Sequence, residues 1–129
     1  MKKESGFTVI ELLVFFAILV TLGVVFVMQK NNIDASNRDY DRKTAINAMY
    51  YDLTESFHKQ NNYYPSTING DNLKAMDPDL FTDPNGVKLG DSGSSYHYEA
   101  LNCTNEGKCQ AFKLSADMER EAQYDKNSN

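Results

Sequence analysis

Two histidines and two cysteines are the residues of this chain most able to do chemistry, and their spacing predicts no catalytic centre. His58 falls in a helical pattern and His97 in a strand-like one, so the two imidazoles belong to different elements. No serine or cysteine stands with a histidine and an acid in a local nucleophile signature. Cys103 and Cys109 form neither a C-x-x-C pair nor a set of four metal ligands. We therefore expect no enzyme, no cofactor and no metal site, and we interpret His58 as a partly exposed surface residue.

Oxygen-bearing side chains crowd one loop, and such loops can bind calcium. They are Asp77, Asp79, Asp83, Asn85 and Asp91. Their spacing, interrupted by prolines, does not match an EF-hand, so we interpret them as solvated loop charges. Eight tyrosines could offer a stacking surface for single-stranded nucleic acid. The net charge is −5 and basic residues are not interleaved with the aromatic ones, so we do not expect direct nucleic-acid binding.

Glu11 is the one ionisable side chain within an otherwise apolar run from Phe7 to Met28. Insertion of a carboxylate at the centre of a membrane helix costs roughly 2.5–3.5 kcal/mol on insertion scales. The presence of Glu11 in this apolar run therefore requires an explanation. One explanation is that Glu11 lies near the interface and reaches water. The other is that it pairs with a positive group on another chain.

The apolar run is long enough to cross a bilayer, because 22 helical residues extend roughly 33 Å. No small-residue cleavage site of the secretory type follows Met28. The leader, residues 1–6, is net positive through Lys2 and Lys3 and is expected to stay in the cytoplasm. These features predict a single-pass membrane protein with an exported C-terminal body.

The stretch Ser5–Val14, SGFTVIELLV, resembles the class III signal of type IV pilins and the related pseudopilins. The resemblance implies that a prepilin peptidase cuts between Gly6 and Phe7 and methylates the new amine of Phe7. It also implies that Glu11 is the partner of this amine between subunits. The two groups are four residues apart on one helix face, so the pair forms within one chain or between staggered neighbours.

Weaker landmarks in the rest of the chain look like those of small pilins and major pseudopilins. They are Tyr63-Tyr64-Pro65, Asp83-Pro84-Asn85-Gly86, Tyr96 with Tyr98, and the segment Phe112–Ala116. Together with the signal they extend the resemblance to about two-thirds of the chain. The resemblance implies a pilin-like α+β fold, with residues 7–28 as a transmembrane and filament-core helix.

Residues 29–62 are predicted to continue this helix as an amphipathic segment. Apolar side chains recur at helical spacing at Ile46, Met49, Tyr50, Leu53 and Phe57. Charged side chains are expected largely off this stripe: Arg42, Lys43, Asp52, Glu55 and Lys59. The loosely periodic stretch 31–41 is expected to be exposed or frayed. Asn61 and Asn62, followed by Pro65, are expected to end the helix.

Residues 63–129 are predicted to form a small, loop-rich β domain with a polar tail. Segments 96–101 and 110–116 alternate like strands, and the simplest arrangement is an antiparallel hairpin packed on the helix stripe. Residues 73–76 are expected to form one helical turn, and the tail 119–129 is expected to fray.

Cys103 and Cys109 flank the predicted turn of this hairpin. Opposed hairpin positions bring Cβ atoms within about 5.5 Å, close to what a disulfide requires. Export places the turn where oxidation persists, so we expect a disulfide between them.

The sequence is therefore interpreted as a structural subunit of a type IV pilus-like filament at the cell surface. Its expected partners are copies of itself in a helical homo-oligomer, the prepilin peptidase, the pilus assembly machinery and, before assembly, the lipid bilayer. A pseudopilin of a type II secretion-like machine shares all of these features. A membrane-anchored extracytoplasmic binding domain would keep the anchor, but it would have no need of Gly6-Phe7 or Glu11.

Overall fold

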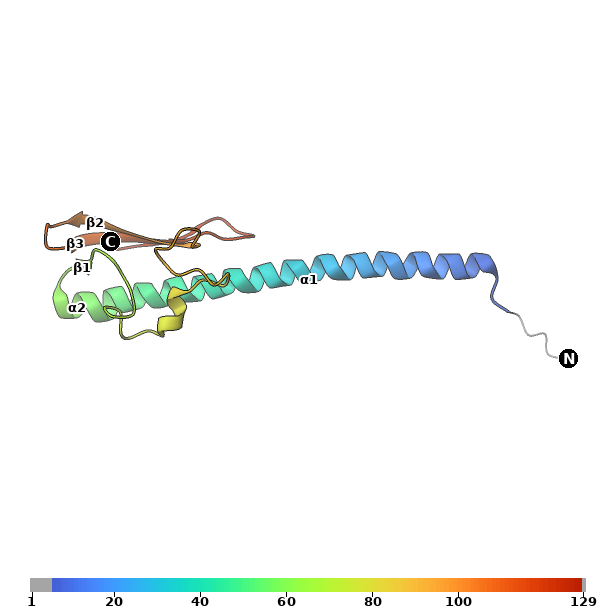
Figure 1. The fold of residues 1–129 in the computed structure, drawn as a ribbon, viewed down its shortest axis with the longest axis horizontal. Coiled ribbons are helices and arrows are strands. Elements are labelled where there is room, and N and C mark those ends of the chain that lie inside the picture. The colour runs from blue at the N-terminus through green and yellow to red at the C-terminus, as the bar shows by residue number, and fades with distance from the viewer. Residues whose placement is uncertain (1–5, 129) are drawn as a thin grey trace. The chain divides into compact units, whose positions relative to one another are not determined.

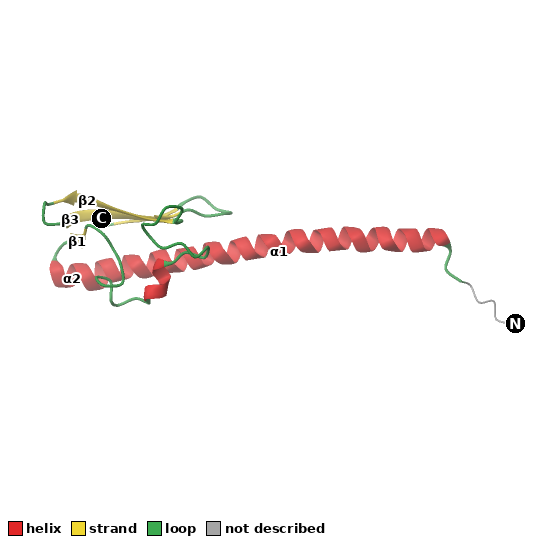
Figure 2. Ribbon diagram, in the orientation of Figure 1, coloured by secondary structure: helices red, strands yellow, loops and turns green. Residues whose placement is uncertain are grey.

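A computed structural model of the chain describes residues 6–128. Its helical elements are α1 (Val9–Tyr51), the π-helical segment η1 (Asp52–Phe57), α2 (His58–Asn61) and the 3-10 helix η2 (Pro78–Phe81) (Figure 1). Its strands are β1 (Tyr64–Pro65), β2 (Tyr96–Cys103), β3 (Lys108–Ala116) and β4 (Tyr124–Asn127) (Figure 2). The predicted α+β class, one long N-terminal helix with a small antiparallel sheet, is confirmed.

The chain divides into two compact units, Met1–Ala35 and Ser36–Asn129. In the first unit the regular structure of the described residues is α1 alone. The second unit holds the rest of α1, the other helical segments and all four strands. The residues of the hydrophobic core and those packed against it lie between Ala45 and Tyr124, so the second unit contains this whole core.

The apolar stripe of the second unit is buried as predicted. Ile46, Met49 and Leu53 are at most 1% exposed, and Tyr50 and Phe57 pack partly against them. Within the stripe the helix widens at η1, where the His58 N–H donates to the carbonyl of Leu53, five residues back.

The helix ends where the sequence predicts. Asn62 has a φ of 61° and donates its N–H to the carbonyl of His58 at 2.7 Å. This is a left-handed cap, and asparagine accepts that conformation more readily than most residues. Pro65 lies three residues further on, in β1.

The predicted hairpin is confirmed, and the sheet extends beyond it. β2 pairs antiparallel with β3 over most of their length, from Tyr96 opposite Ala116 to Cys103 opposite Cys109. The other edge of β3 is shared by β1 and β4. Because opposed residues point to the same face, Tyr96, Tyr98 and Ala100 share a face with their partners in β3.

That face packs on the helix stripe, as expected. Phe112 lies at its centre, with ring centroids 6.1 Å from Tyr50 and 4.8 Å from Tyr64. Phe112 and Leu114 are at most 1% exposed. The sheet and the stripe therefore form one core.

Several local predictions are wrong. Residues 73–76 form no helix; the helical turn is η2, where Asp77 caps the N-terminus by accepting the Asp79 N–H at 3.0 Å. The polar tail does not fray, because Tyr124–Asn127 pairs with β3 as β4. Asp52 lies off the stripe as predicted, but it is buried, and its carboxylate accepts the Ala75 N–H at 2.8 Å.

The stretch 31–41 is continuous helix, and its end is buried. Asp39 is 2% exposed and Arg42, also predicted off the stripe, is 1% exposed. Their charges are paired with each other and with the segment after β3, which no apolar pattern encodes.

Candidate functional site

The N-terminal half of α1 exposes nearly all of its apolar surface. Large apolar side chains from Phe7 to Met28 are between 47% and 88% exposed. The helical stretch Val9–Asn61 is long and apolar enough to cross a membrane, and its most apolar window is 0% buried. An exposed apolar surface of this length is typical of a segment that contacts lipid or another apolar chain.

This surface begins at a hydrogen-bonded cap formed by Thr8 and Glu11. The Thr8 N–H and hydroxyl both donate to Glu11 Oε2, at 2.9 and 3.0 Å. The Glu11 N–H in turn donates to the Thr8 hydroxyl oxygen, at 3.3 Å. Thr8 is thus the N-cap of α1 and Glu11 its third residue, which is the arrangement of a capping box.

The capping box gives Glu11 a local role that the sequence interpretation missed. The signal that could have revealed it is Thr8-x-x-Glu11 directly before the apolar run. The box uses one carboxylate oxygen for two donors, and the negative charge also lies at the positive end of the helix dipole. A pairing of Glu11 with a group on another chain must therefore share this carboxylate with the cap.

The predicted cleavage junction lies just before the cap. Gly6 has no neighbour within 4 Å of a Cβ placed on it, and Phe7 is 88% exposed. Residues 1–5 of the predicted leader lie outside the described residues. Cleavage between Gly6 and Phe7, and methylation of Phe7, stay predictions.

Comparisons with protein-family models, with curated proteins and with solved structures find no match to this chain. What the chain does must therefore be inferred from its own residues.

The predicted disulfide is present. Cys103 and Cys109 are opposed in β2 and β3 and are bonded to each other. The turn between them is closed by the Thr104 N–H, which donates to the carbonyl of Lys108 at 2.8 Å, and Gly107 takes a φ of 75°. The disulfide thus fastens the tip of the hairpin.

The acidic loop gives no support for a calcium site. The Asp83 carboxylate is buried and accepts the N–H groups of Asn85, Val87 and Ser95 at 2.9 Å. Burial raises the pKa of Asp83, but these N–H groups and the Ser95 hydroxyl, which also donates to the carboxylate, outweigh it and hold the pKa below its ordinary value. Asp83 therefore organises the loop, contrary to the prediction of solvated charges only. Within residues 6–128 no three His, Cys, Asp or Glu side chains are grouped to hold a metal ion.

The two histidines lie apart. His58 stacks on the ring of Tyr64, with centroids 4.5 Å apart, and is half-buried. His97 is exposed on β2, where Nε2 lies 2.9 Å from Asp117 Oδ2. Neither imidazole is placed with a nucleophile among these contacts.

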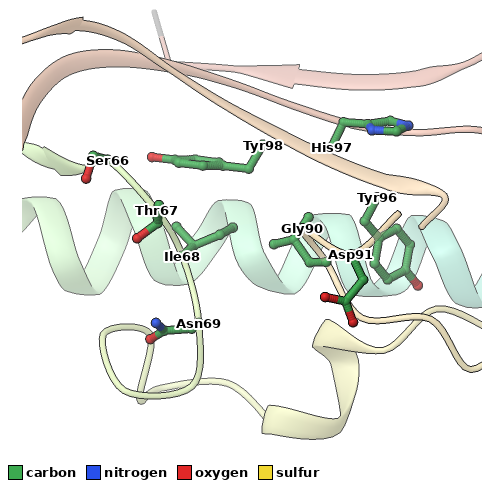
Figure 3. A pocket seen from close by; sticks show the side chains of 10 residues that line it. Ser66, Thr67, Ile68, Asn69, Gly90, Asp91, Tyr96, His97 and Tyr98 are labelled. Carbon is green, nitrogen blue, oxygen red and sulfur yellow. The ribbon is translucent and has the colours of Figure 1, made fainter. Parts of the chain in front are cut away.

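A groove of about 560 Å³ lies beside the start of β2, lined by residues 66–69, 89–91 and 96–98 (Figure 3). The two tyrosines that line this groove contribute to the packing of the folded protein. Tyr96 is 3% exposed, and the Tyr98 hydroxyl donates to the carbonyl of Pro65 at 2.7 Å. Burial raises the pKa of both phenols, that of Tyr96 to about 12, so both stay protonated near neutral pH.

A buried ionic cluster fastens the segment after β3 to α1. The Asp39 carboxylate accepts the N–H groups of Glu119 and Arg120, at 2.8 and 2.9 Å. Arg42 Nη1 lies 2.8 Å from Asp39 Oδ1 and 2.9 Å from Glu119 Oε1, and Arg38 binds Glu119 through two further hydrogen bonds. Burial raises the pKa of Asp39, but the two N–H groups and then Arg42 outweigh it and lower the pKa.

Proposed function

We propose that this chain is a structural subunit of a type IV pilus-like filament, which assembles through the N-terminal half of α1. The observation that carries the proposal is the exposed apolar surface from Phe7 to Met28, which begins with the capped carboxylate of Glu11. In the proposal, these apolar side chains are buried away from water by packing against the same helix of neighbouring subunits.

Burial of this surface holds neighbouring helices together, but it does not fix their alignment along the helix axis. At roughly 25 cal/mol per Å² it contributes tens of kcal/mol in gross terms, yet lipid tails are equally apolar. A charged pair adds the missing specificity. In the proposal, the amine created by cleavage before Phe7 pairs with Glu11 of a neighbouring subunit, whose second carboxylate oxygen is not used by the cap.

Two substitutions separate the charge of Glu11 from its capping role. Glu11→Gln keeps an acceptor for Thr8 but removes the charge, so we expect at least a tenfold loss of surface filaments with unchanged membrane levels. Thr8→Val removes the hydroxyl but keeps the charge. It weakens the helix start by about 0.5–2 kcal/mol and should reduce filaments much less.

The measurement is the yield of sheared filaments, with the cellular amount of the chain checked by immunoblot. Normal filament yield from Glu11→Gln cells would contradict the charged pair. Equal losses from both variants would assign the effect to the cap.

A further inference from the structure

An apolar hollow of about 430 Å³ lies on the flank of α1 away from the sheet-facing stripe. It is formed by the helix around residues 48–56 and by residues 75–80, and Tyr51 beside it is 61% exposed. The apolar residues that line it are Ala48, Tyr51, Ala75, Met76 and Leu80.

The rim of this hollow is acidic. Three carboxylates line it: Asp52, Glu55 and Asp77. Asp52 is turned to the Ala75 N–H, whereas Glu55 and Asp77 are exposed. Lys59 pairs with Glu55 at the surface, which leaves the rim with an excess of negative charge. We call this site the acid-rimmed hollow, and its chemistry suits an apolar group that carries a cation.

The first unit presents a surface of that kind. Phe26, Lys30 and Ile33 are spaced i, i+4 and i+7, so they share one face of α1. Phe26 is 71% exposed, Ile33 is 58% exposed and Lys30 is also exposed. We call these three residues the basic-apolar face.

We propose that the basic-apolar face of one copy of this chain docks on the acid-rimmed hollow of a second copy. Phe26 and Ile33 cover the apolar floor, and the Lys30 ammonium lies against Glu55 and Asp77. The inference rests on the proposed filament and names one of its contacts. The face and the hollow are different surfaces of the same chain, so the contact repeats head to tail and generates an open array rather than a closed pair.

Cysteine cross-linking in cells tests the contact on the full chain. A variant with both Lys30→Cys and Glu55→Cys should form a ladder of dimers, trimers and larger species on non-reducing gels of sheared filaments. Lys30→Cys alone should form no ladder. The matched control is Met28→Cys with Glu55→Cys, because Met28 lies on the opposite side of the helix from Lys30.

Charge reversal tests the same contact without cysteines. Lys30→Glu should lower filament yield about tenfold at an unchanged membrane level, and Lys30→Glu combined with Glu55→Lys should restore most of the loss. If the cysteine variants do not assemble, this rescue decides the matter. Filaments that form normally with Lys30→Glu, or a ladder as strong in the Met28 control, would overturn the contact while leaving the filament proposal intact.

An absence of filaments from the unsubstituted chain would instead contradict the proposed function. If Glu55→Lys alone leaves filaments normal but weakens the capture of another protein by the hollow, the occupant is a different partner and the inference is wrong.

Discussion

Arg42→Met should destabilise the body of the protein more than any surface substitution. Arg42 and Asp39 are 1% and 2% exposed, so loss of the guanidinium leaves a buried carboxylate without its counter-ion. Breaking a buried pair in this way costs about 3–5 kcal/mol. The N–H groups of Glu119 and Arg120 still bind Asp39, so we expect the lower end, about 3 kcal/mol.

A domain of this size is stable by about 5–15 kcal/mol, so this is a large share of the total. At roughly 4–8 °C per kcal/mol the melting temperature should fall by about 12–24 °C. The assay is thermal and urea unfolding followed by circular dichroism on residues 31–129, a fragment that contains the whole hydrophobic core described above.

Arg38→Met is the matched control, since Arg38 also pairs with Glu119 but with both side chains about one-third exposed. Such a pair contributes about 1 kcal/mol or less. Asp39→Asn combined with Arg42→Met removes both charges and should recover part of the loss. If Arg42→Met melts no lower than Arg38→Met, the buried pair of Arg42 and Asp39 does not stabilise the fold.

Two other outcomes are expected of the same fragment. The hydrogen bond from Arg38, opposed by burial and assisted by Arg42, lowers the pKa of Glu119 from 4.5 to about 2. A lowered folded-state pKa stabilises above the unfolded value, so the free energy of unfolding should be level from pH 7 to 5 and fall between about pH 4.5 and 2. Urea titrations across this range measure it, and a level profile down to pH 2 would contradict the assignment. Cys103→Ser with Cys109→Ser should lower stability by about 2–3 kcal/mol without changing the circular dichroism spectrum of the folded fragment. Labelling of both cysteines in denatured, non-reduced protein from cells would show that the disulfide does not form there.

Apolar spacing was sufficient to predict the helix stripe and the hairpin. Ile46, Met49 and Leu53 recur at helical spacing, and Tyr96, Tyr98 and Ala100 at strand spacing, and each set buries one face. The disulfide followed because the hairpin register opposes its two cysteines.

Polar contacts between distant segments could not be predicted in this way. Asp39 binds N–H groups about 80 residues further along the chain, and β4 forms by pairing with the edge of β3. Residues 31–41 and 119–129 are both polar, and from composition alone each was predicted to be exposed or frayed. The Thr8–Glu11 cap differs, because it is local and its spacing was readable from the sequence.

In the proposed filament, the chain is cut before Phe7 and is incorporated through the helix that follows. Intact-mass measurement of the subunit from sheared surface filaments tests it most directly. We expect the mass of residues 7–129 with one added methyl group and one disulfide. Assembled chains that still begin at Met1, or surface filaments from the source cell that do not contain this chain, would contradict it.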